Sequence, residues 1–93
     1  MSTNNMPVYT HVKKVPVKSG HGPNTNYLVC YGYVDWQRDG NLKTAIYVLM
    51  EYGGNISYST PPHILTEKDD TGQSDFIRVM KAVDELRLQY QLD

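Results

Sequence analysis

The feature that most constrains the fold is an Asp39-Gly40 dipeptide between two runs of strand-forming residues. Residues 27–36 precede it and residues 42–52 follow it, and both runs are rich in β-branched and aromatic side chains. An Asp-Gly pair in this setting is a strong local signal for a β-hairpin. The sequence therefore predicts two neighbouring antiparallel strands at the centre of the chain.

Further strands are predicted on either side of this hairpin. Residues 8–17 suit an edge strand, because Pro7 and Pro16 cannot donate hydrogen bonds to a neighbour. The Gly53-Gly54 pair predicts a second turn, followed by a short strand at 56–60 that Pro61-Pro62 ends.

A single helix is predicted at the C-terminus, from Ser74, which can cap it, to Tyr90. Apolar side chains recur there at spacings of three and four, forming one stripe that we expect to face the sheet: Phe76, Val79, Met80, Val83, Leu86 and Tyr90. The predicted fold class is therefore α+β, of order β-β-β-β-α. It comprises an antiparallel sheet of three to four strands and one C-terminal amphipathic helix packed on one face.

Size and charge limit the function. The 93 residues suit one domain, which we place at 7–93, with a disordered tail at 1–6. Nine basic against ten acidic side chains argue against a dedicated binder of duplex DNA, which usually carries a basic excess. The polar N-terminus resembles no secretion signal and no run is long enough to span a membrane, so a cytoplasmic location is expected.

No catalytic or metal-binding pattern is apparent. Cys30 lies inside a predicted strand, where a free cysteine is usually a small, inert core residue. His11, His21 and His63 are far apart and lack the spacing of a zinc site. Because no set of nucleophile, base and orienting group emerges, we expect neither enzymatic activity nor a cofactor or metal.

The length of the central loop decides which tyrosines share a sheet face. A two- or four-residue loop around Asp39-Gly40 groups Tyr31 and Tyr33 with Ile46. A three-residue loop at 39–41 groups the same tyrosines with Tyr47 instead. We favour the three-residue loop, because it sorts aliphatic side chains to one face and a tyrosine-rich set with charged ends to the other.

One helix covers only one sheet face, so the second face is expected to expose tyrosines and aliphatic side chains, as contact surfaces do. The alternative is that the N-terminal arm, the 61–73 segment or a bend in the sheet covers it. We therefore expect a small non-enzymatic protein-binding or regulatory module that grips a protein partner or itself as a homodimer. The expected partner-binding residues are Tyr27, Tyr31, Tyr33, Tyr47 and Lys43.

A second hypothesis is binding of single-stranded nucleic acid. At the level of topology, four antiparallel strands and a helix resemble the dimeric single-strand-binding folds of transcriptional coactivators. The resemblance implies aromatic rings that stack on bases and basic groups that meet phosphates, although the net charge disfavours this function. The candidate contact residues are Trp36, Arg38, Lys13, Lys14 and Lys18. Clustering of the basic residues beside the tyrosines would favour this hypothesis, and interspersed acids would weaken it.

Overall fold

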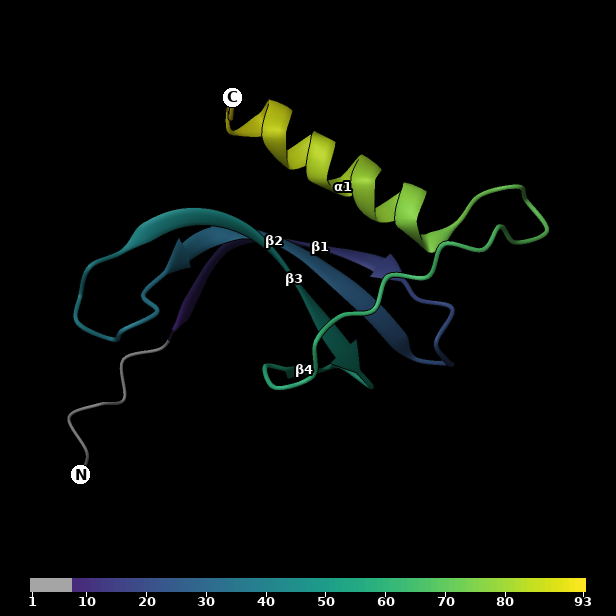
Figure 1. Cartoon of the computed structure of the whole chain (residues 1–93), viewed down its shortest axis with the longest axis horizontal. Helices are drawn as coiled ribbons and strands as arrows, with labels where there is room; N and C mark the ends of the chain where they lie inside the picture. The colour runs from purple at the N-terminus through teal and green to yellow at the C-terminus, as the bar shows by residue number, and fades with distance from the viewer. Residues whose placement is uncertain (1–7) are drawn as a thin grey trace.

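The structure, a computed structural model, describes residues 8–93 as a four-stranded antiparallel sheet with one helix on its surface (Figure 1). The elements are β1 (Tyr9–Lys18), β2 (Thr25–Val34), β3 (Lys43–Tyr52), β4 (Asn55–Ser57) and α1 (Asp75–Gln89). The strands are neighbours in chain order, and α1 contacts β1 and β2. The predicted α+β fold of order β-β-β-β-α is confirmed. The tail predicted at 1–6 lies outside the described residues.

Helix α1 begins where the sequence predicts. The Ser74 side chain accepts a hydrogen bond from the backbone N–H of Ile77, as an N-cap does. Within residues 8–93, this helix lacks the length and apolar character that a membrane crossing requires.

The predicted apolar stripe faces the sheet only in part. Val79 and Leu86 are buried against it, together with Ala82, which the pattern omitted. Phe76 and Met80 are 43% and 46% exposed, so the prediction was wrong for both. The stripe is wider than the line along which a helix can contact a sheet, and its flank is left in solvent.

The register of the central hairpin contradicts the favoured one. Tyr31 lies opposite Ile46, and Val34 lies opposite Lys43, so the connecting loop spans residues 35–42. The three-residue loop is therefore wrong, and the face assignment is that of the alternative register. The wider loop is organised by Asp35, whose carboxylate accepts hydrogen bonds from the backbone N–H groups of Asp39 at 3.0 Å and Gly40 at 2.8 Å.

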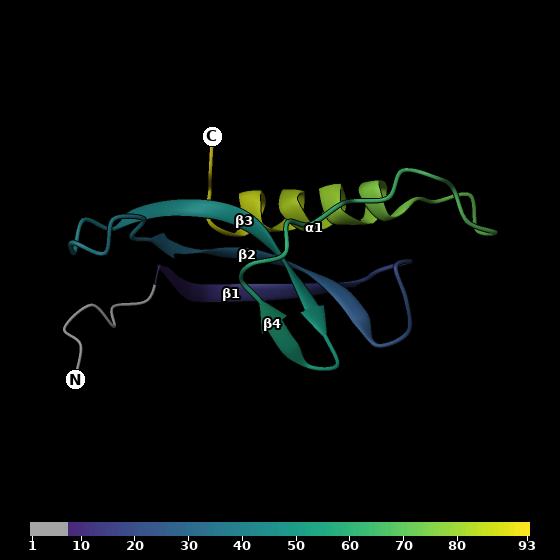
Figure 2. The same ribbon diagram turned by 60° about the horizontal axis from the view of Figure 1, so that its bottom comes forward.

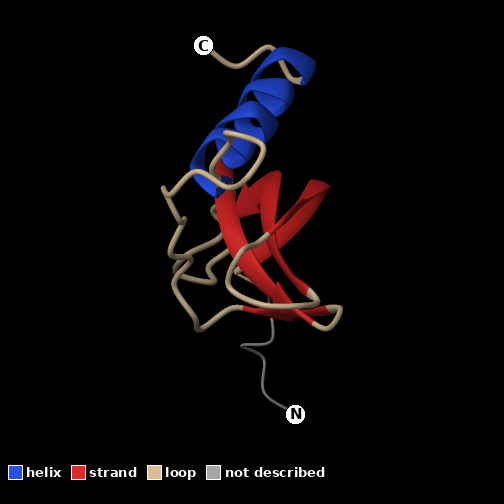
Figure 3. Ribbon diagram, turned by 90° about the vertical axis from the view of Figure 1, so that its right-hand side faces the viewer, coloured by secondary structure: helices blue, strands red, loops and turns tan. Residues whose placement is uncertain are grey.

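The sheet bends sharply where β1 crosses β2. A bulge interrupts the register of β1 between His11 and Lys13, and the opposite residue is Gly32. A Cβ atom at Gly32 would lie 2.1 Å from the carbonyl oxygen of Thr10, so only glycine fits this close approach. Figures 2 and 3 show the strands turning steeply across one another beneath the helix.

The bend gives the sheet a small core on each side. The larger core lies under α1 and contains Tyr27, Val29 and Met50. A second cluster of Leu28, Cys30 and Leu49 lies on the opposite side, hereafter the far face. Burial raises the pKa of the Cys30 thiol to about 11, in keeping with the expected core cysteine. The sheet thus partly covers its own second face, as the bend alternative proposed.

Candidate functional site

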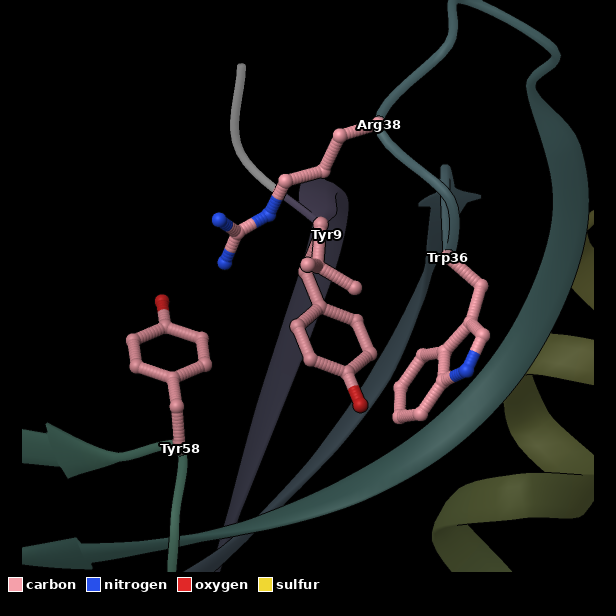
Figure 4. A pocket seen from close by; sticks show the side chains of 5 residues that line it. Tyr9, Trp36, Arg38 and Tyr58 are labelled. Atoms are coloured by element: carbon pink, nitrogen blue, oxygen red, sulfur yellow. The ribbon is translucent and has the colours of Figure 1, made fainter. Parts of the chain in front are cut away.

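The candidate site is an open pocket of about 510 Å³ lined by aromatic rings and one guanidinium group (Figure 4). Tyr9 comes from the start of β1, Tyr58 follows β4, and Trp36 and Arg38 come from the loop between β2 and β3. Val8 completes the lining. Tyr9 also packs on the far-face cluster, so the pocket belongs to the side of the sheet away from α1.

Coiling of the sheet creates this pocket. β1 and β4 are the first and last strands of the sheet, separated by two others. The rings of Tyr9 and Tyr58 nevertheless stack with their centroids 5.8 Å apart and their planes 23° apart. Two strands in a flat sheet would be too far apart for this contact, since neighbouring strands are about 4.8 Å apart.

Hydrogen bonds through His11 link Tyr47 of β3 to Tyr58, which lines the pocket. Its Nδ1 lies 2.7 Å from the Tyr47 hydroxyl, and its Nε2 lies 3.0 Å from the Tyr58 hydroxyl. Burial, with a smaller contribution from the positive charge of Lys14, lowers the pKa of His11. Burial also raises the pKa of Tyr47 to about 12. His11 and Tyr47 are therefore uncharged at neutral pH, and the histidine donates to one hydroxyl and accepts from the other.

The loop that carries Trp36 and Arg38 is firmly anchored. The backbone N–H of Asp35 donates to the Val8 carbonyl at 2.7 Å, and the N–H of Arg38 donates to the Asp35 carbonyl at 3.1 Å. Burial alone would raise the pKa of the Asp35 carboxyl, but the hydrogen bonds from Gly40 and Asp39 hold it below its ordinary value. The Trp36 side chain lies between these anchors, and 74% of its surface is exposed to solvent.

The basic side chains of the strands are divided between the two sides of the sheet. Residues directly opposite one another in a sheet share a face. Lys14 lies opposite Cys30 and Lys43 opposite Val34, so both share the far face. Lys18, at the end of β1, lines a hollow with Asp69, Asp75 and Arg78. Lys13 lies opposite Tyr31 and so points to the helix side.

The acidic side chains are concentrated elsewhere. Seven of the ten lie in the C-terminal third of the chain: Glu67, Asp69, Asp70, Asp75, Asp84, Glu85 and Asp93. On and around the far face, Glu51 accepts a hydrogen bond from the Asn26 side chain, and Asp39 lies near Trp36 and Lys43. Lys14, Arg38 and Lys43 thus lie on the side of the pocket with two acids among them, the exposed Asp39 and the half-buried Glu51.

The structure divides the predicted tyrosine surface between two faces. Tyr27 is fully buried in the main core. Tyr31 stacks on Tyr90 with ring centroids 4.1 Å apart, and Tyr33 lies on the same helix side. Only Tyr47 belongs to the far face. The expectation that Tyr31, Tyr33 and Tyr47 share one face was wrong, because it followed from the wrong register.

Sequence reasoning found two pocket residues, Trp36 and Arg38, and missed Tyr9, Tyr58 and the bridging His11. Each of the missed residues occurs in a strand or at its end without a local motif, and only the coiled sheet brings them together. Within residues 8–93, no group of three or more histidine, cysteine, aspartate or glutamate side chains is placed to hold a metal ion.

Comparisons with known proteins found no matching family model, no similar curated protein and no similar solved structure.

Proposed function

We propose that this protein is a non-enzymatic module that binds single-stranded nucleic acid through the pocket and the far face. One observation carries the proposal: Tyr9, Tyr58 and Trp36 surround an open cavity together with Arg38. Aromatic faces that accept bases beside cations that meet phosphates are the recurring elements of single-strand recognition. The bases do not all cluster beside the tyrosines, because Lys13 lies on the helix side and Lys18 lines a hollow with Asp69 and Asp75. The proposal therefore rests on the pocket itself, with Lys14 and Lys43 on the same side of the sheet.

The physical argument concerns what an unpaired base gains here. A base that stacks on an exposed aromatic ring contributes roughly 1–3 kcal/mol to binding. Trp36 offers such a ring, since most of its surface is in solvent. Arg38 lines the same pocket, where its guanidinium group can meet a phosphate or stack on the base. A base in a duplex is already stacked and paired, so single strands are expected to bind more tightly than duplexes.

The net charge of −1 does not oppose this proposal, because most acidic side chains lie away from the pocket, on α1 and the segment that precedes it. Lys14 and Lys43 lie on the far face, and Arg38 lines the pocket. Attraction between exposed charges falls off over a Debye length, about 8 Å at physiological salt. The attraction of a bound nucleic-acid strand would therefore depend mainly on the charges of the face on which it lies.

The test uses the intrinsic fluorescence of Trp36, which is the single tryptophan of the chain. Titration with a short oligothymidylate is expected to quench this fluorescence, and the binding constant should fall as salt rises. With three basic contacts, from Lys14, Arg38 and Lys43, the slope of log K against log salt is expected to be about −2, from roughly 0.7 for each phosphate contacted.

Trp36→Ala is expected to weaken binding by roughly 5- to 150-fold, which corresponds to the loss of one stacked base. Binding by this variant is followed by fluorescence anisotropy of a labelled oligonucleotide. Leu88→Ala is the matched control, because Leu88 is also an exposed apolar side chain but lies on α1. Equal affinities for the two variants, or no salt dependence, would refute the proposal. Capture of a protein through Trp36 without nucleic-acid binding would instead support the protein-binding hypothesis.

A further inference from the structure

The two outer edges of the sheet differ in how well they are protected. β1 forms one edge along its whole length. It carries a bulge after His11, a proline at position 16 and lysines at 13, 14 and 18. Bulges, prolines and lysines are the features by which natural sheets prevent edge-to-edge association. The β1 edge is therefore unsuited to pairing with another strand.

The edge formed by β3 has none of this protection. β4 pairs only with Met50, Glu51 and Tyr52, which leaves residues 43–49 of β3 with an open side. Figure 2 shows β4 alongside only the last part of β3. Within residues 8–93, no backbone hydrogen bond joins residues 43–49 to any segment except β2. The stretch contains no proline and no bulge, and its single charge, Lys43, is at one end.

The open side presents a defined set of backbone groups. The N–H of Gly53 donates to the carbonyl of Asn24 across the end of the β2–β3 pair. Because hydrogen-bonding direction alternates along an antiparallel strand, odd-numbered residues of β3 face β2 and even-numbered residues face outward. Thr44, Ile46 and Val48 therefore each direct an N–H and a C=O away from the sheet.

Apolar side chains flank this edge on the helix side. Ile46 and Val48 pack at the margin of the main core and are only half-buried. Arg78 of α1 lines a surface hollow with Lys18 and Ser19, so the flank of the helix that carries Arg78 lies beside the end of β1. Residues advance about 100° each along a helix, which places the exposed Phe76 and Met80 on the flank opposite Arg78, away from β1. At this edge, the half-buried side chains of Ile46 and Val48 therefore lie beside open backbone groups.

We propose that a second copy of this chain pairs with the open edge, β3 against β3, around a two-fold axis. A strand edge can pair antiparallel with itself, because the two-fold operation makes the two strands identical. β4 blocks pairing beyond residue 49 in both copies, so full use of the edge allows one register, with Ile46 opposite Ile46 of the second copy. Thr44 then lies opposite Val48, and Lys43 lies opposite Leu49.

In this register, the outward-facing N–H and C=O groups of the edge all find hydrogen-bond partners. Thr44, Ile46 and Val48 all face outward, and the register pairs each with another member of the same set. Each of the three pairs exchanges two hydrogen bonds, about six in all. No like charges meet, because Lys43 lies opposite a leucine. The two helices lie on the same side of the combined sheet, as the two-fold axis requires.

Charge reversal at the two-fold axis tests the proposal, because Ile46 is the residue that meets its own copy. The wild-type protein is expected to sediment as a dimer that dissociates on dilution. Ile46→Lys and Ile46→Glu place like charges opposite each other, and each alone is expected to be monomeric. An equimolar mixture of the two is expected to regain dimers, which high salt weakens. Val15→Lys is the matched control, since Val15 is equally half-buried against the main core but lies in β1.

Amide hydrogen exchange of the wild-type protein gives a second reading that needs no substitution. The amides of Thr44, Ile46 and Val48 are expected to exchange rapidly at low concentration and to become protected as dimers form. Three results would overturn the proposal: a wild-type monomer at all concentrations, a dimer that Ile46→Lys leaves intact, or edge amides unprotected in the dimer. All measurements are made without nucleic acid and with Trp36 unchanged, so they are independent of the binding proposed for the pocket.

Discussion

Replacing Tyr27 by phenylalanine should reveal how much of the fold depends on one buried hydroxyl group. The Tyr27 hydroxyl donates to the Asp75 carboxylate at 2.8 Å and accepts from the backbone N–H of Leu65 at 3.2 Å. Asp75 also accepts from the N–H of Gly20 at 2.8 Å. This network joins β2, the turn after β1, the connection before the helix, and the first residue of α1.

The expected loss follows from these contacts. Burial, with a further contribution from Asp75, raises the pKa of Tyr27, so the group remains a hydrogen-bond donor at neutral pH. A hydrogen bond to a charged group contributes roughly 1.5–3 kcal/mol to stability, and an N–H left without a partner costs about 1 kcal/mol more. The phenylalanine ring still fills the core, so no large cavity forms. We expect Tyr27→Phe to lower the free energy of unfolding by roughly 2–4 kcal/mol.

Urea unfolding followed by circular dichroism measures this difference. Tyr33→Phe is the control, because Tyr33 lies on the same face of β2 but is 40% exposed. Its loss is expected to stay within about 0.5 kcal/mol, as for most surface substitutions. If the two variants lose equal stability, the Tyr27 hydroxyl does not hold these segments together and the argument from its contacts is wrong.

Two further outcomes are expected. Gly32→Ala should destabilise the protein by more than the roughly 1–3 kcal/mol of ordinary overpacking, because the added Cβ meets backbone at Thr10, and a melting temperature equal to that of wild type would contradict this. The loop at 35–42 should also depend on acid. Hydrogen bonding holds the pKa of Asp35 below its ordinary value. The ionised carboxylate therefore stabilises the loop fully above about pH 4, and this stabilisation is lost as the pH falls through the lowered pKa. The amide exchange of Asp39 and Gly40 measures this loss, and equal protection at pH 2 and pH 6 would show that the carboxylate does not order the loop.

Local signals in the sequence determined the elements of this protein. Ser74 and the apolar repeat that follows it placed α1, and Gly53-Gly54 placed the turn between β3 and β4. Such signals act over a few residues, because a cap or a turn satisfies backbone groups that are close in the chain. The element order and the α+β class followed from them.

The register of β2 against β3 was decided by tertiary structure. The Asp39-Gly40 signal predicted a tight loop, but the buried Asp35 carboxylate organises a wider one. Side chains alternate across a sheet with a period of two, so an error of one residue exchanges every side chain between the faces. Tyr31 consequently lies under the helix, stacked on Tyr90, and Tyr47 lies on the far face.

The pocket depends still more on tertiary structure. Trp36 and Arg38 were recognised from the sequence because an aromatic ring and a guanidinium group occur together in one loop. Tyr9 and Tyr58 are forty-nine positions apart, one in β1 and one just after β4, at opposite ends of the sheet order, and no local pattern links them. They meet because the bulge in β1 and the close approach at Gly32 coil the sheet. The sequence by itself determined the elements, and the curvature of the sheet decided which side chains form the site.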